Sequence, residues 1–326
     1  MNKNEKRVLS GIQPSGNLHL GNYFGMMSKM IEYQEEDDLF CFVADFHALT
    51  ANQNSKVLSS NTYDAVCDFI ALGLKPEKTT FWVQSDVSEV TELAWILSSF
   101  TTVGLMDRST TYKDKIAKGI KPNMGLYSYP ILMAADILLF NSNLVPVGKD
   151  QKQHIEMARD IANKFNANYG DIFTLPEPDI VKETQLIPGI DGQKMSKSYN
   201  NTIPIFGEDK VIRKKVMSII TDNASVNEPK DKNTPLFYLY SLFADSNEKQ
   251  LLSEKYDSSG LRYGDLKLEL YEKIMDYFAP FRQERALLHS KPDDVKDILK
   301  LGAKKAKLVA FEMLDKIRSA IGLRLF

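Results

Sequence analysis

The sequence has 326 residues, 43% of them hydrophobic and 26% charged, and a formal net charge of −2. This composition is typical of a globular protein with a substantial core, and the charge argues against binding nucleic acid through an overall basic surface. Its two cysteines lack C-x-x-C spacing, which argues against a disulfide framework and a cysteine-based zinc site. No stretch approaches membrane-spanning length and no signal-like region is seen, so we expect a cytoplasmic protein.

The first two hundred residues alternate short apolar runs with stretches of helical periodicity. The runs predict strands at Arg7–Ser10, Leu39–Asp45, Thr79–Gln84 and Leu144–Val147. The periodic stretches predict helices at Leu20–Tyr33, Asn61–Leu72, Ser88–Phe100, Tyr127–Phe140 and Gln151–Phe165. Strand and helix in alternation predict an α/β fold, a Rossmann-like parallel sheet with crossover helices. Ligands bind such sheets at the carboxyl ends of the strands.

After about residue 205 the pattern becomes helical only. Helices are predicted at Glu208–Ile219, Pro235–Phe243, Glu248–Tyr256, Tyr263–Phe278 and Asp293–Ile321. Pro280 is expected to end the fourth of these. The last helix has one apolar stripe, which must pack against another part of the chain. We therefore expect a catalytic domain at residues 1–204 and an all-helical domain at 205–326, with the last helix returning to the first domain.

Residues 11–22 read Gly-Ile-Gln-Pro-Ser-Gly-Asn-Leu-His-Leu-Gly-Asn and connect the first predicted strand to the first predicted helix. Glycines allow a close backbone approach, and a helix N-terminus offers free N–H groups to an anion such as a phosphate chain. His19 and Asn22 share a face of the first helical turn, where they are possible phosphate donors. Taken alone, the segment is more often a simple turn with a helix cap.

Residues 194–198 read Lys-Met-Ser-Lys-Ser and lie between Pro-Gly-Ile-Asp-Gly at 188–192 and Tyr-Asn-Asn at 199–201. Two ammonium groups and two hydroxyls on such a loop can close over a triphosphate and neutralise charge as pyrophosphate leaves. Together with residues 19–22, this segment resembles the paired signatures of class I aminoacyl-tRNA synthetases. The resemblance implies activation of an amino acid by attack of its carboxylate on the α-phosphate of ATP.

Three further segments narrow the resemblance. They are residues 11–16, residues 129–138 (Tyr-Pro-Ile-Leu-Met-Ala-Ala-Asp-Ile-Leu) and residues 145–154 (Val-Pro-Val-Gly-Lys-Asp-Gln-Lys-Gln-His). All three look like the bacterial-type tryptophanyl-tRNA synthetase family, and the resemblance covers essentially the whole chain. One departure is His19, because bacterial members commonly carry Thr at that position.

Tyr129, Met133 and Asp136 are spaced four and three apart, so they share one face of a predicted helix. An indole needs an apolar wall and an acceptor for its N–H, and Met133 and Asp136 provide these. The alternative is that Tyr129 and Met133 belong to the core and Asp136 is solvated. However, a carboxylate within so apolar a run needs a partner.

The resemblance implies roles for individual residues. ATP would contact Gln13, Pro14, Ser15, His19, Gly21, Asn22, Gly148, Lys149, Asp150, Ile187, Lys194, Met195, Ser196, Lys197 and Ser198. Tryptophan would contact Gly11, His47, Tyr129, Met133, Asp136 and Gln151. The catalytic residues would be Gln13, Lys115, Lys194 and Lys197. Alternative interpretations are a helix N-cap for Asp150 and a structural role for His47.

The expected function is therefore that of a tryptophan–tRNA ligase. ATP would enter with Mg²⁺ as a cosubstrate, with no tightly bound cofactor and no protein metal site. The partners implied are tRNA(Trp), L-tryptophan, ATP and a second copy of the chain in a homodimer. Lys300, Lys304 and Lys307 share a helix face and are candidate contacts to tRNA phosphates, although such a face is more often merely solvated.

Three alternatives stay open at this point. A tyrosyl-tRNA synthetase would have a similar helix but Gln in place of Met133. A non-catalytic synthetase paralogue would keep the fold, but such proteins tend to lose the loop lysines that this chain retains. Another nucleotidyltransferase would share the first segment but lack the helical half.

Overall fold

The protein is described by a computed structural model that covers residues 6–117, 119, 121–148, 151–180 and 187–323. Five strands form one parallel sheet in the order β3-β2-β1-β4-β5. The strands are β1 (Arg7–Ile12), β2 (Asp38–Val43), β3 (Thr80–Val83), β4 (Leu144–Val147) and β5 (Glu177–Ile180). The predicted fold class is confirmed, and the order reverses between β1 and β4, where ligands bind in such sheets.

The helices connect and cover these strands. Those up to β5 are α1 (Leu20–Asn22), the π-helix η1 (Tyr23–Met27), α2 (Ser28–Glu32), η2 (Tyr33–Glu35), α3 (Asp45–Leu49), α4 (Ser55–Ala71), η3 (Gln84–Asp86), α5 (Glu89–Ser98), α6 (Val103–Met106), α7 (Thr110–Ala117), α8 (Met124–Leu139) and α9 (Lys152–Tyr169). Those after β5 are η5 (Lys197–Tyr199), α10 (Asp209–Met217), α11 (Pro235–Ser241), α12 (Ser246–Asp257), α13 (Tyr263–Ser290) and α14 (Pro292–Ile321). Within the described residues, no helix is both long and apolar enough to cross a membrane.

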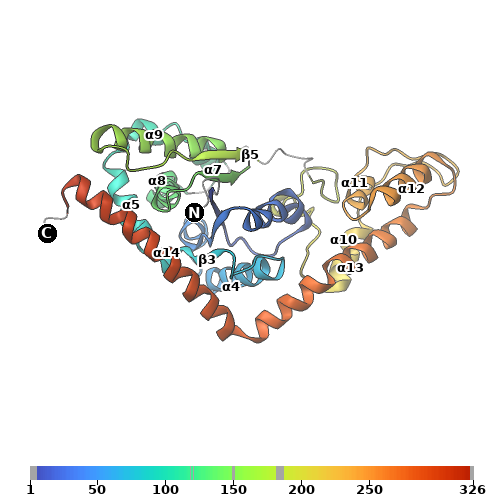
Figure 1. Cartoon of the computed structure of the whole chain (residues 1–326). Helices are drawn as coiled ribbons and strands as arrows, with labels where there is room; N and C mark the ends of the chain where they lie inside the picture. Colours follow the sequence, from blue (N-terminus) through green and yellow to red (C-terminus); the bar gives the residue numbers. More distant parts are fainter. Residues whose placement is uncertain (1–5, 118, 120, 149–150, 181–186, 324–326) are drawn as a thin grey trace. The chain divides into compact units, whose positions relative to one another are not determined.

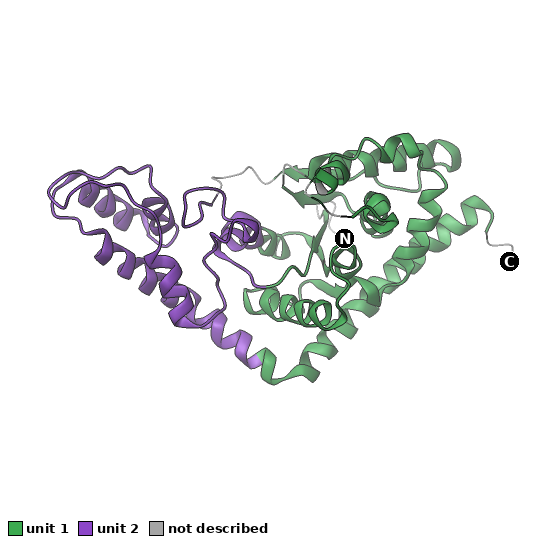
Figure 2. Cartoon of the chain, turned by 180° about the vertical axis from the view of Figure 1, so that it is seen from behind, with its two compact units in different colours: residues 1–16, 30–182, 288–326 green, residues 17–29, 183–287 purple. Residues whose placement is uncertain are grey.

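The chain forms two compact units, coloured separately in Figure 2. Unit 1 comprises residues 1–16, 30–182 and 288–326, and unit 2 comprises residues 17–29 and 183–287. This division differs from the boundary expected after residue 204. The sheet and the last helix share unit 1, whereas the segment with His19 belongs to unit 2.

Backbone and aromatic contacts explain why residues 17–29 belong to unit 2. The N–H of Leu20 donates to the carbonyl of Ile203 at 3.0 Å, next to an antiparallel bridge between His19 and Pro204. The ring of Tyr23 packs edge-on against Phe278 at 5.3 Å between centroids. These contacts link residues that are far apart in the sequence, so composition alone does not predict them.

Helix α14 packs on β3, α5 and α8 within unit 1 (Figure 1). Its inner face carries small residues, among them Gly302, Ala303 and Ala306, which are all buried. A Cβ atom at Gly302 would lie 1.7 Å from the carbonyl oxygen of Phe81 in β3. Glycine is therefore required for the helix backbone to approach the strand this closely.

Helix α13 corrects the expected break at Pro280, because it runs from Tyr263 to Ser290 without interruption. A proline inside a helix removes one backbone hydrogen bond and crowds the preceding turn. Phe278 is buried next to this point, and its ring packs against Phe281 with centroids 5.9 Å apart. Tertiary packing of this aromatic cluster compensates for the local cost, which the sequence pattern does not reveal.

Candidate functional site

The predicted tryptophan-site residues gather in unit 1, near the carboxyl ends of the strands. Gly11 lies at the end of β1, His47 is in α3 directly after β2, and Gly148 follows β4. A Cβ at Gly11 would approach the ring of Phe42 to 2.7 Å, so packing against β2 requires a glycine there. In the turn that follows, Gln13 and Ser15 are exposed and Pro14 is buried.

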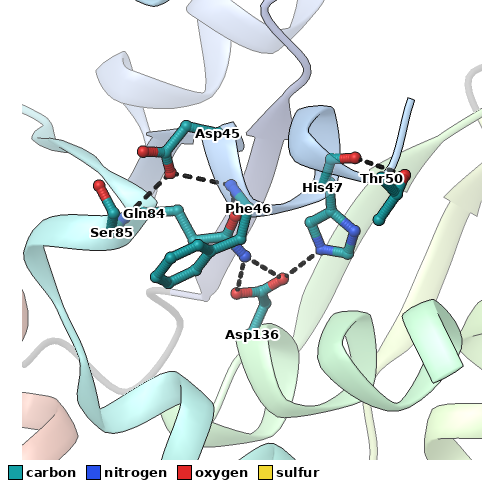
Figure 3. Close-up of polar contacts among 7 residues, drawn as sticks. All are labelled: Asp45, Phe46, His47, Thr50, Gln84, Ser85 and Asp136. Carbon is teal, nitrogen blue, oxygen red and sulfur yellow. Dashed lines mark hydrogen bonds and ion pairs between the residues drawn. The ribbon is translucent and has the colours of Figure 1, made fainter. Parts of the chain in front are cut away.

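Asp136 of α8 is the centre of a buried polar cluster (Figure 3). Its side chain points at two others that come from different elements. Nε2 of His47 lies 2.8 Å from Oδ2, and Nε2 of Gln84 donates to Oδ1 at 2.8 Å and to Oδ2 at 3.0 Å. Asp136 is 3% exposed, so the partner that a buried carboxylate needs is present twice over.

Burial raises the pKa of Asp136, and the hydrogen bonds from His47 and Gln84 oppose that rise. Asp45 raises it further through charge repulsion. The two donors therefore favour the ionised carboxylate in an apolar environment. An ionised, buried carboxylate is a strong acceptor for an N–H group that enters the same pocket.

A second buried cluster joins α8 to α9. Nδ1 of His154 lies 2.9 Å from Oε1 of Gln151, and the hydroxyl of Tyr129 contacts the opposite ring nitrogen, Nε2. Because Gln151 accepts through its oxygen, Nδ1 carries the proton and Nε2 accepts from Tyr129. The ring of Tyr129 also packs edge-on against His47 at 5.9 Å. Tyr129, His47 and Asp136 therefore lie in one continuous set of contacts.

Met133 is partly buried and packs against the core of unit 1. It occupies the helix face between Tyr129 and Asp136, as the spacing predicts. The structure therefore places Tyr129, Met133, Asp136, His47 and Gln151 around the same part of α8. The individual roles of these side chains in binding stay predictions.

Two functional candidates were missed by sequence reasoning. Gln84 was included in a strand, although it lies at the carboxyl end of β3, where ligand-binding side chains are common in parallel sheets. His154 lies in the segment that resembles the family, but nothing in the spacing indicated that it is fully buried between Gln151 and Tyr129.

The paired signature segments meet in unit 2. The N–H of Gly21 donates to Sδ of Met195 at 3.3 Å. A Cβ at Gly21 would lie 3.1 Å from Met195 Cβ and 3.1 Å from His19 Nδ1, so glycine allows the two segments to approach. The side chain of Asn22 accepts from the N–H of His19 at 3.1 Å and caps the first helical turn.

The loop at residues 187–201 is held by a buried amide. Asn201 is 1% exposed; it accepts from the N–H of Ser196 at 2.7 Å and donates to Asp191 at 2.7 Å and to the carbonyl of Lys194 at 3.0 Å. The carbonyl of Ile187 accepts from the N–H of Met195 at 2.9 Å. These bonds fix the backbone between the two lysines, and both Lys194 and Lys197 are exposed.

His19 is buried, and its pKa is lowered to about 4 by that burial and by the nearby ammonium of Lys197. It is therefore a neutral imidazole at neutral pH. Its Nδ1 is buried without a hydrogen-bond partner among the described residues. An imidazole nitrogen in this position has unused capacity for a bound ligand. Ser196 and Ser198 hydroxyls lie 2.8 Å apart in the same loop.

Some predicted residues lie outside the described part of the chain. They are Lys149, Asp150 and the side chain of Lys115. Gly148 is described, and its carbonyl accepts from the N–H of Gln151 at 2.9 Å, immediately before α9. Among the described residues, no group of three or more His, Cys, Asp or Glu side chains is arranged to hold a metal ion.

Comparison with known proteins gives consistent matches. A tryptophan–tRNA ligase of Fusobacterium nucleatum subsp. nucleatum is 50% identical over 319 residues, which cover 98% of this chain and 98% of the relative. A tryptophan–tRNA ligase of Campylobacter jejuni is 48% identical over 318 residues, which cover 97% of this chain and 100% of the relative.

The structural match has the same breadth. The crystal structure of tryptophanyl-tRNA synthetase from Campylobacter jejuni complexed with ADP and tryptophan has a TM-score of 0.94 and 48% sequence identity, covering 97% of this chain and 99% of that one. The family model described as "tRNA synthetases class I (W and Y)" matches residues 1–279. The chain therefore belongs to the class I tRNA synthetase family that comprises the tryptophan and tyrosine enzymes.

Proposed function

We propose that this chain is a tryptophan–tRNA ligase that activates L-tryptophan with ATP and transfers it to the 3′-terminal ribose of tRNA(Trp). The observation that carries the amino-acid assignment is the buried Asp136 carboxylate, held by His47 and Gln84 on the face of α8 that also carries Met133. A buried anionic acceptor beside an apolar wall suits an indole ring with one N–H.

The tyrosine alternative fits these residues less well. A phenol has a hydroxyl that both donates and accepts, and Met133 offers it no matching amide. Sites that hydrogen-bond one polar group discriminate strongly against ligands that lack it, by ~10⁴-fold or more. The named relatives at about half identity over nearly the whole chain are also tryptophan–tRNA ligases.

ATP is proposed as the second substrate. A related enzyme has been solved with ADP and tryptophan, which supports use of an adenine nucleotide. Here Lys194 and Lys197 would neutralise the charge of the leaving pyrophosphate, and His19 would meet a phosphate oxygen as a neutral group. The other proposed ATP contacts are Gln13, Pro14, Ser15, Gly21, Asn22, Gly148, Lys149, Asp150, Ile187, Met195, Ser196 and Ser198, and Lys115 completes the catalytic set.

Catalysis would rely on positioning and electrostatic stabilisation, without a covalent enzyme intermediate. The tryptophan carboxylate attacks the α-phosphorus, the bond to the β-phosphate oxygen breaks, and pyrophosphate leaves. Tryptophanyl-AMP then reacts with a ribose hydroxyl of tRNA, and AMP leaves. Mg²⁺ would arrive with ATP, because it keeps most of its waters and binds mainly through phosphates.

The helical part of the chain is proposed to bind tRNA, with unit 2 reading the anticodon region. Lys300, Lys304 and Lys307 of α14 line one surface hollow together with Phe311. Three ammonium groups on one helix face suit contacts to phosphates, and an exposed aromatic ring suits stacking on a base. Asp86 and Glu89 line the same hollow, so these lysines would contact tRNA at its edge.

A cytoplasmic homodimer is proposed as the working form. Helices α5 and α6 both pack on α8, and each of the three carries a strongly exposed apolar side chain. Trp95 is 76% exposed, Val103 69% and Met124 73%. Large apolar side chains exposed on neighbouring helices are typical of protein–protein contact sites. A second copy of the chain is the partner that the family implies.

ATP–pyrophosphate exchange measured with each of the twenty amino acids tests this proposal. We expect exchange with tryptophan only, and no exchange with any amino acid would contradict it. In Lys194→Ala and Lys197→Ala, exchange should fall by ~10²-fold or more while tryptophan binding changes little. Lys210→Ala is the matched control, because Lys210 is an exposed lysine of unit 2 outside the loop.

A further inference from the structure

Gln84 is the most tightly held polar side chain in the Asp136 cluster. It is 1% exposed. Its Oε1 accepts from the N–H of Phe46 at 3.2 Å, and its Nε2 donates to both oxygens of Asp136. Because the oxygen is committed to a backbone donor, the amide can turn only its NH₂ group toward the carboxylate.

A neighbouring carboxylate fixes the backbone on both sides of this contact (Figure 3). Asp45 Oδ1 accepts from the N–H of Phe46 at 3.0 Å and from the N–H of Ser85 at 3.0 Å. These bonds join the segment after β2 to the segment after β3. Gln84 is therefore held at its backbone through Ser85 and at its side chain through Phe46.

We propose that Gln84 is a specificity-determining positioning residue that selects which oxygen of Asp136 accepts the ring N–H of the substrate. This inference rests on the proposed recognition of tryptophan by Asp136. Each carboxylate oxygen has two lone pairs. Oδ2 accepts from both His47 and Gln84, whereas Oδ1 accepts only from Gln84 among the described residues.

Oδ1 is therefore the oxygen with capacity for one more donor. Gln84 also helps to keep the carboxylate ionised, since its hydrogen bond opposes the effect of burial. Without Gln84, His47 alone would hold the side chain, and rotation about the terminal bond would let either oxygen face the pocket. Selection for a ring N–H would then weaken more than binding of the ring itself.

The test uses tryptophan and an isostere in which sulfur replaces the indole N–H. The measured quantity is the ratio of kcat/KM for the two substrates in ATP–pyrophosphate exchange. In Gln84→Met, which keeps the length of the side chain and removes its donors, the ratio should fall by about 10- to 100-fold. Because both substrates are measured on one sample, this ratio does not depend on the folded fraction.

Gln34→Met is the matched control. Gln34 is also buried in unit 1, and its amide likewise accepts from a backbone N–H, that of Lys75 at 2.8 Å, and donates to a carbonyl, that of Gly73 at 2.9 Å. It makes no printed contact with the cluster of Asp136. The substrate ratio in Gln34→Met should equal that of the unmodified chain.

A second variant, Gln84→Glu, separates positioning from packing. Its carboxyl group would face Asp136, with His47 and Asp45 as the other charged or titratable groups of the cluster. Two facing carboxyl groups hold one proton between them, and that proton is lost as pH rises. The substrate ratio should therefore fall more steeply from pH 6 to pH 8 than in the unmodified chain.

The outcomes distinguish the two levels of the argument. An unmodified chain that shows no tryptophan-dependent exchange, or no preference for tryptophan over the sulfur isostere, overturns the proposed recognition itself. If the preference is present but survives unchanged in Gln84→Met, only the role of Gln84 is overturned. A fall in Gln84→Met that is matched by Gln34→Met would also overturn it, because loss of any buried amide would then suffice.

Discussion

Replacing Gly302 with alanine tests whether α14 is held on the sheet by direct contact of the two backbones. The added Cβ would lie 1.7 Å from the Phe81 carbonyl oxygen and 2.6 Å from its carbonyl carbon. Both neighbours are backbone atoms of a central element, so a side-chain rotation cannot relieve the overlap. To restore an ordinary contact of 3.4 Å, α14 must retreat from β3 by about 1.7 Å.

The cost follows from what that retreat separates. A gap of 0.5–1 Å already loses a quarter to a half of each dispersion contact, and Ala303, Ala306 and Ala310 all lie on the same buried face. Overpacking a core costs typically 1–3 kcal/mol, and more where the backbone itself must move. Alanine returns about 1 kcal/mol through its higher helix propensity. We expect the free energy of unfolding to fall by about 3 kcal/mol.

Urea unfolding followed by near-ultraviolet circular dichroism measures this effect. Gly104→Ala is the control, because Gly104 is also a helical glycine of unit 1 and an added Cβ there meets nothing within 4 Å. The control should be unchanged or more stable by up to about 1 kcal/mol. Equal midpoints and slopes for Gly302→Ala and the unmodified chain would refute the close approach of α14 to β3.

Other predictions concern charge and association. The pKa of His19 is lowered to about 4, so between pH 6.5 and 4 the unfolded chain binds a proton that the folded chain does not; stability should fall with decreasing pH across this window by about 3 kcal/mol in total, and urea unfolding of His19→Asn should lack this loss. Trp95→Glu should convert a dimer to a monomer in sedimentation velocity, and an unchanged sedimentation coefficient would count against the proposed surface. Lys304→Ala with Lys307→Ala should reduce the salt dependence of tRNA binding in filter-binding assays; an unchanged slope would argue that these ammonium groups are merely solvated.

The sheet was predictable because its central strands are apolar on both faces. Four of the five strands were located from such runs, and β4 was located to the residue. The fifth, β5, was missed because it reads Glu-Pro-Asp-Ile. It lies at the edge of the sheet and pairs only with β4, and edge strands tolerate proline and charge.

Helix positions followed from periodicity, but helix ends and partners did not. The predicted helix at Leu20–Tyr33 is helical throughout, although it changes between α, π and 3-10 forms. The path of α13 through Pro280 depends on aromatic packing from elsewhere in unit 2. The assignment of residues 17–29 to unit 2 depends on contacts to residues near 203 and 278, and a local pattern contains no such information.

The candidate site shows the same limit. Tyr129, Met133 and Asp136 were found together because helical spacing places them on one face. Gln84 was not, because its role arises only when the ends of β2 and β3 lie side by side. His19 was expected as a possible cation, and burial makes it neutral instead. Long-range proximity and burial are the two properties that decide these roles.

The position of α14 in the chain affects how the protein folds during synthesis. More than two hundred residues separate Phe81 of β3 from Gly302 of α14. At about 5–20 residues per second, a ribosome needs about 10–40 s to make that stretch. Throughout this time the apolar face of β3 lacks its covering helix, while residues 183–287 of unit 2 are completed first. A nascent chain stalled before α14 would thus expose its sheet to proteases and to other chains.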